Sequence, residues 1–176
     1  MPIPNSGKVS EILDGSAIDR RSFRPAGWHF AVLPVGLQLD ERTRLVLGAA
    51  AQSGQSTVAY VFGCRSEFED QPSLEIGDLS DLERISFSTV LGHIDTAVVA
   101  ASSRWAALCS PEGFALIGAE AEVIDQLEEA WGGRTALRAE VITGVDENLI
   151  GWGAPIRHLM QHLFGQVGWP LHPGWP

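Results

Sequence analysis

Short runs of apolar, β-branched and aromatic residues, separated by turn-forming residues, predict a series of β-strands. The runs are residues 28–35, 57–62, 96–101, 104–109, 114–118 and 136–143. Pro34 has no N–H to donate, so it predicts that the first strand ends there or lies at a sheet edge. Residues 110–113 (Ser-Pro-Glu-Gly) place Ser, Pro and Gly at favoured positions of a type I turn. An antiparallel hairpin is therefore expected around this turn.

Sequence patterns predict four helices, at residues 40–51, 81–91, 120–131 and 155–164. Apolar residues at helical spacing predict the last two, and acids in the first turn favour the first. Ser80 and Glu83 have the spacing of a capping box, which predicts the start of the second helix. Residues 85–90 also alternate as in a strand, so a strand remains the alternative there.

The mixture of strands and helices predicts the fold class. Strands interspersed with three or four helices, with a hairpin at the centre, indicate a single α+β domain with a largely antiparallel sheet rather than a doubly wound parallel one. The expected organisation is a polar N-terminal arm (1–27), the α+β domain (28–165) and a Trp/Pro-rich C-terminal tail (166–176).

The tryptophans near the C-terminus allow two interpretations. Trp152, Trp169 and Trp175 all lie in the last 25 residues, and two of them stand between Gly and Pro. Tryptophan is enriched at protein interfaces, so these residues could mediate self-association. In the alternative, the tail folds back and buries its indoles in the core of the domain.

The charge is strongly negative and uneven. The 176 residues carry a net charge of −10, and residues 66–147 hold four bases and seventeen acids. Such a surface repels phosphate, which argues against binding nucleic acid or anionic membranes and favours a basic protein partner. No apolar run approaches the length of a signal peptide or membrane span, so a cytoplasmic location is expected.

One acidic stretch predicts where such a partner binds. Glu122, Asp125 and Glu129 recur on one face of the helix predicted at 120–131, where like charges destabilise a helix by roughly 0.2–0.5 kcal/mol per pair. Local stability does not explain them, whereas a basic partner or a general need for solubility would. The predicted partner-binding residues are Glu120, Glu122, Asp125, Glu128, Glu129, Glu69, Asp70, Asp78 and Asp81.

No motif specifies a reaction, a cofactor or a metal. His158 and His162 have the i, i+4 spacing of metal ligands but need a third ligand, such as His172, and are expected to be solvated. Residues 48–56 are small and Gly-containing but lack the Gly-Lys-Ser/Thr of a phosphate loop. Cys64 and Cys109 are expected to be reduced core residues.

A small enzyme remains an alternative. Its site would be assembled from scattered residues, of which His29, His93 and Cys109 are the candidates for a base and a nucleophile.

Residues 103–131 resemble a segment common in small bacterial immunity proteins. In that segment a strand carrying Trp meets a short turn, a strand ending in Gly and an acidic amphipathic helix. The resemblance implies a cytoplasmic, non-catalytic protein that blocks a toxin by covering its active site. The leading hypothesis is therefore an immunity protein that occludes the basic face of a toxin. A self-associating structural or regulatory domain and the small enzyme are the alternatives.

Overall fold

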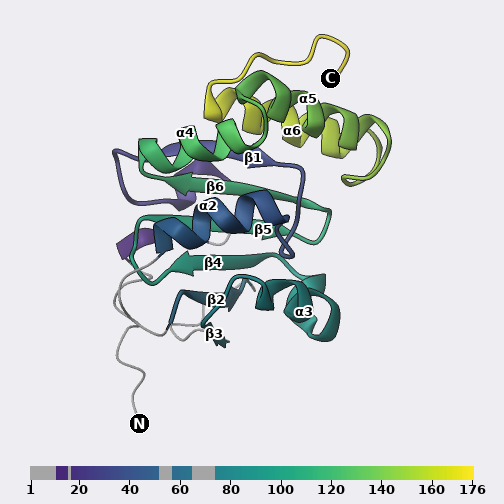
Figure 1. The fold of residues 1–176 in the computed structure, drawn as a ribbon. Helices are drawn as coiled ribbons and strands as arrows, with labels where there is room; N and C mark the ends of the chain where they lie inside the picture. The colour runs from purple at the N-terminus through teal and green to yellow at the C-terminus, as the bar shows by residue number, and fades with distance from the viewer. Residues whose placement is uncertain (1–10, 16, 52–56, 65–73) are drawn as a thin grey trace.

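The computed structural model describes residues 11–15, 17–51, 57–64 and 74–176 (Figure 1). These residues form one α+β domain with a six-stranded antiparallel sheet, which confirms the predicted fold class. The strands are β1 (His29–Leu33), β2 (Ala59–Gly63), β3 (Leu74–Ile76), β4 (Thr96–Ala100), β5 (Trp105–Ser110) and β6 (Phe114–Ala119). The α-helices are α2 (Glu41–Ala51), α3 (Asp81–Ser88), α4 (Ala121–Ala130), α5 (Arg134–Asp146) and α6 (Gly153–Val167). Two 3₁₀ turns also occur, η1 (Arg20–Ser22) and η2 (Val90–His93).

The strands lie in the order β1-β6-β5-β4-β2-β3, and each paired neighbour is antiparallel. The hairpin β5–β6 stands near the centre, as predicted, with Ser110 paired to Phe114. Its turn is closed by the Gly113 N–H, which donates to the Ser110 carbonyl at 3.2 Å, and Gly113 has a φ of 92°. Strand β1 lies at the sheet edge and ends directly before Pro34, as that residue predicts.

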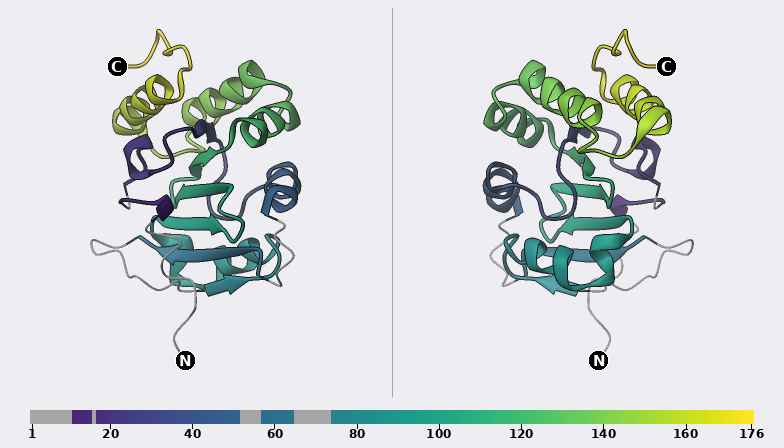
Figure 2. Two further views of the ribbon diagram at one scale, coloured as in Figure 1. Left: turned by 90° about the vertical axis from the view of Figure 1, so that its left-hand side faces the viewer. Right: turned by 90° about the vertical axis from the view of Figure 1, so that its right-hand side faces the viewer.

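Helices α2 and α4 cover one face of the sheet, while η1 and α6 lie on the other side (Figure 2). Two buried indoles join the layers on the first face. The Trp105 Nε1–H donates to the Leu47 carbonyl of α2 at 2.9 Å. The Trp131 Nε1–H, just after α4, donates to Thr43 Oγ1 of α2 at 3.2 Å. Each indole therefore buries its ring and satisfies its polar group.

An aromatic cluster holds the N-terminal segment against the second face. Phe23 packs edge-on against Phe30 of β1, with ring centroids 5.3 Å apart. A Cβ on Gly118 of β6 would lie 2.8 Å from both rings, so only glycine allows this approach. Part of the predicted N-terminal arm thus belongs to the packed core.

Two local predictions are wrong. Residues 136–143, expected as a strand, lie within helix α5, because Leu137, Val141 and Val145 recur every fourth residue and are all buried.

The predicted capping box does not form, since Ser80 has helical backbone angles and makes no side-chain cap. The Asp78 carboxylate instead accepts from the Ser80 N–H at 2.7 Å. The segment after Ser80 is helical, not a strand.

The C-terminal tail has no regular structure but is folded onto α6. Trp169 and Trp175 are buried, with ring centroids 5.4 and 5.9 Å from that of Phe164. The Gln161 side chain both donates to the His172 carbonyl and accepts from its N–H, each at 2.8 Å. The fold-back interpretation is therefore confirmed for these two indoles.

Candidate functional site

Five acids around α4 were predicted to bind a partner. Three of them, Glu120, Glu122 and Glu128, form ion pairs with arginines that lie outside the helix. Arg104 Nη2 lies 2.8 Å from Glu120 Oε2 and 3.8 Å from Glu122 Oε2. Arg134 Nε lies 2.9 Å from Glu128 Oε1, and Glu128 is buried. Glu128 therefore stabilises the junction between α4 and α5 and is not part of an open surface.

The other two acids of α4 remain available. Asp125 and Glu129 are exposed, one helical turn apart, and neither forms an ion pair with a residue that the structure describes. Fewer acids of α4 are thus open to a partner than the sequence pattern indicates, and Asp125 and Glu129 are the two that remain.

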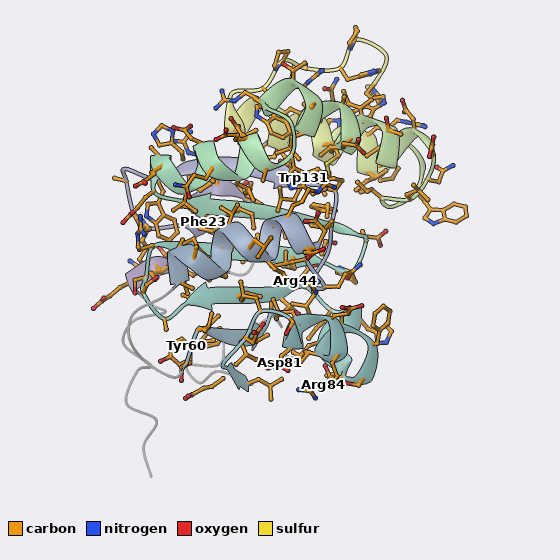
Figure 3. The ribbon with its side chains drawn as sticks, in the orientation of Figure 1. Phe23, Arg44, Tyr60, Asp81, Arg84 and Trp131 are labelled. Carbon is orange, nitrogen blue, oxygen red and sulfur yellow. The ribbon has the colours of Figure 1, made fainter. Side chains whose placement is uncertain are left out.

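The remaining predicted acids lie elsewhere. Asp81 Oδ1 lies 3.4 Å from Arg84 Nη2 on α3 (Figure 3). The hydrogen bond from the Ser80 backbone holds the pKa of Asp78 below its ordinary value. Helix α3 lies toward the β2–β3 edge, whereas α4 covers β1 and β6. The structure does not bring the two acidic sets together, and Glu69 and Asp70 lie outside the described residues.

The candidate catalytic residues do not converge. His29 pairs with Ala119 at one end of the sheet, whereas Cys109 pairs with Ala115 near the other end. His93 is exposed at the end of η2. These residues do not form one site.

His158 and His162 lie on the exposed face of α6, as predicted. His162 Nε2 lies 3.3 Å from Asp19 Oδ2 and 2.8 Å from Gln166 Nε2, so it contributes to the contact between α6 and the N-terminal segment. Hydrogen bonds, chiefly from the Arg21 side chain, hold the pKa of Asp19 well below its usual range.

The third suggested metal ligand belongs to the tail. His172 packs against Trp175 at 4.7 Å between ring centroids, and its Nδ1 accepts from the Gly174 N–H. Within the described parts of the chain, no three His, Cys, Asp or Glu side chains are grouped as metal ligands.

Among the described residues, no helix combines the length and apolar character of a membrane span.

The two cysteines are free thiols. Burial raises the pKa of Cys64 to about 12 and raises that of Cys109 as well. Both thiols are therefore protonated at neutral pH, whereas a nucleophilic cysteine needs its thiolate. These are the features of core residues.

A half-buried carboxylate lies beside the thiols. Burial raises the pKa of Asp95, and the negative charge of Glu112 raises it further. Asp95 and Glu112 therefore create a local excess of negative charge where β4 begins, close to the β5–β6 turn.

Asp95→Asn should stabilise the protein at neutral pH. The pKa of Asp95 in the folded protein lies above the unfolded value of about 3.9. Ionisation of Asp95 therefore lowers the free energy of unfolding as the pH rises above about 4. The urea midpoint of the variant should exceed that of the wild type at pH 7, and the difference should vanish below about pH 4. Asp125→Asn controls for net charge. A loss of stability at pH 7 would show that the ionised carboxylate is favourably bound.

Exposed apolar side chains lie on two separate segments at one end of the sheet. Phe87 and Val90, in the segment α3–η2, are 77% and 55% exposed. Leu149 and Trp152, in the loop between α5 and α6, are 70% and 80% exposed. Figure 1 shows α3 and the α5–α6 loop at the same end of the strands, at the right of the view. These four residues are called the apolar end below.

The β5–β6 turn lies between the two parts of the apolar end. On one side, the Gly151 N–H donates to the Glu112 carbonyl at 3.1 Å. On the other, a small cavity of about 50 Å³ is lined by residues of the turn and of η2, including Pro111 and Gly92. The α5–α6 loop is therefore hydrogen-bonded to the turn, and the η2 segment packs close to it.

Two glycines shape the backbone around Trp152. Gly151 and Gly153 have φ values of 55° and 64°, in the left-handed region that favours glycine. A Cβ on Gly151 would lie 2.8 Å from the Ile156 side chain. The sequence Gly-Trp-Gly was the signal for this site, and it was not recognised in the sequence pattern.

An open groove of about 310 Å³ lies beside the indole. Its lining consists of Glu112, Trp152, Pro155, Ile156 and Leu159. The walls are thus apolar apart from one carboxylate. Such a surface suits a partner group with both an apolar and a charged part.

Comparison with protein-family models, with curated proteins and with solved structures gives no match for this chain.

Proposed function

We propose that the chain is a protein-binding module of the immunity type, which neutralises a basic toxin by covering its active face. The observation that carries the proposal is the apolar end, above all the 80% exposure of Trp152. The segment that resembles immunity proteins adopts the expected order of strand, turn, strand and helix in β5, β6 and α4.

The exposed side chains of the apolar end can still gain free energy if a partner buries them. Burying a large apolar side chain is worth about 1.5–3 kcal/mol, and the apolar end forgoes this for Phe87, Leu149 and Trp152. Tryptophan is among the residue types enriched at binding hot spots. Burial of these side chains by a partner would therefore contribute to the free energy of binding, because folding of the chain does not bury them.

The charge of the protein favours a basic partner. The net charge is −10, and Asp125 and Glu129 carry no ion pair with a described residue. Glu112 and Glu147 add exposed carboxylates near the apolar end. Complementary charge accelerates the encounter of two proteins, and the apolar contacts then hold the complex.

The apolar end also supports the second candidate, a self-associating domain. In that case the contact would use Trp152, because Trp169 and Trp175 are buried within the chain. A symmetric contact would bring two copies of Glu112 toward each other, which disfavours this arrangement. Sedimentation at increasing protein concentration separates the candidates, since only self-association makes the mass rise.

The charge-reversal variant Asp125→Lys/Glu129→Lys tests the steering role of α4. Tagged protein should capture one basic protein from the native organism at low salt and release it at high salt. With that protein purified, we expect the variant to lower the association rate about 3–10-fold at low salt and to reduce its salt dependence. The dissociation rate should change little.

The matched control is Glu11→Lys/Glu140→Lys, which makes the same change in net charge at other exposed acids. If both double variants slow association equally, net charge alone acts and α4 is not the steering face. If the tagged protein captures no basic protein, the proposed function is wrong. If a captured protein is retained equally by a variant lacking the Trp152 side chain, the apolar end is not its binding surface.

A further inference from the structure

Resting on the proposed function, we propose that the groove beside Trp152 accepts one lysine or arginine side chain of the partner. The aliphatic stem lies along Pro155 and Leu159, the cationic group faces the indole, and its charge pairs with Glu112. This assigns the groove a specific occupant within the larger interface.

The shape of the groove fits a single long side chain. Its volume of about 310 Å³ is at the lower end of ligand pockets, which span about 300–1000 Å³. Pro155, Ile156 and Leu159 of α6 form the apolar part of its lining beside the indole. Lys and Arg bury their stems along such apolar walls while their charged ends reach a polar group.

The backbone that carries the Glu112 carboxylate is held in place by two hydrogen bonds. The Glu112 N–H donates to Ser110 Oγ at 3.1 Å, and the Glu112 carbonyl accepts from the Gly151 N–H at 3.1 Å. Both backbone groups are thus fixed, so the side chain projects from an ordered turn. A preorganised group loses less entropy on binding.

Glu112 lacks a cation of its own among the described residues. Arg157, on the helix that forms the groove wall, is directed to Asp146, with Nε 3.7 Å from Oδ1. Asp95 adds a second negative charge nearby. An acidic occupant would be repelled, and a purely apolar one would cover Glu112 without compensating its charge.

The indole of Trp152 is also available. It is 80% exposed, and it makes no aromatic or cation–π contact with another described residue. By contrast, the Trp131 ring already carries the Arg42 guanidinium, 3.8 Å from its centroid. A cation placed over an exposed tryptophan face is attracted by the ring quadrupole.

The test uses small probes, so it needs no partner protein. N-acetyl-arginine amide is titrated into the ¹⁵N-labelled protein while the Trp152 indole N–H is followed by NMR, with Trp152→Phe assigning the signal. N-acetyl-norleucine amide, apolar and uncharged, is the comparison probe. We expect a saturable shift with the arginine probe and at least threefold weaker binding to Glu112→Gln, with no change for Glu140→Gln.

Equal binding of the norleucine probe, unchanged binding to Glu112→Gln, or no saturable shift would overturn the assignment of the groove. These outcomes are separate from failure of the proposed function, which is decided by capture of a partner. Unchanged thermal midpoints of the two Gln variants ensure that the comparison concerns the groove and not the fold.

Discussion

Trp169→Ala should lower the free energy of unfolding by about 3–5 kcal/mol, a large fraction of the stability of a domain of this size. Trp169 is 3% exposed and packs on Phe164 directly after the left-handed Gly168 that ends α6. Its removal leaves a cavity between the tail and α6 and weakens the anchoring of residues 170–176.

Urea unfolding measures this loss, with Leu171→Ala as the matched control in the same tail. Leu171 is largely exposed, so its removal should change stability by no more than about 0.5 kcal/mol. Equal, small effects of both variants would contradict the view that the tail is part of the core.

Trp152→Ala should leave the stability of the protein nearly unchanged but weaken the binding of its partner. The indole makes few contacts within the chain, so stability should stay within about 0.5 kcal/mol of the wild type. Affinity for the captured partner should fall at least tenfold, and about 30-fold if Trp152 is a hot spot worth about 2 kcal/mol.

Titration calorimetry with the purified partner measures the affinity of this variant, and Leu171→Ala again serves as the control. A partner that binds Trp152→Ala as tightly as the wild type would remove the apolar end from the interface. A large loss of stability would instead show that the indole supports the fold.

The parts of the fold that sequence could predict are those with local causes. Residues 110–113 set the turn of the central hairpin through Pro and Gly, whatever surrounds them. Pro34 ends β1 because it has no N–H to donate. Helices α4 and α6 follow from apolar stripes at helical spacing.

One error arose because the same residues fit both the alternation of a strand and the spacing of a helix. Residues 136–143 alternate well enough for a strand, and only the packing of Leu137, Val141 and Val145 on one helical face decides for α5. At the start of α3 the error has another cause, because capping depends on backbone angles that the spacing of Ser80 and Glu83 does not specify. The backbone of Ser80 is helical, so Asp78 accepts the hydrogen bond.

The candidate site depends on contacts that a linear pattern does not contain. Arg104 reaches Glu120 because β5 and β6 place their ends side by side, which leaves Asp125 and Glu129 as the open acids. From the sequence, the three tryptophans near the C-terminus were interpreted as one group, although Trp152 stands between two glycines and the other two between Gly and Pro. Only the packing of the tail separates the buried Trp169 from the exposed Trp152.

The most direct test of the central claim is hydrogen exchange of the protein in complex with its captured partner. The apolar end predicts slowed exchange in three segments that are separate in sequence, at residues 86–93, 110–113 and 147–153, with smaller changes on the outer face of α4. Protection confined to other surfaces, with these three segments unchanged, would contradict the assignment of the apolar end as the binding surface.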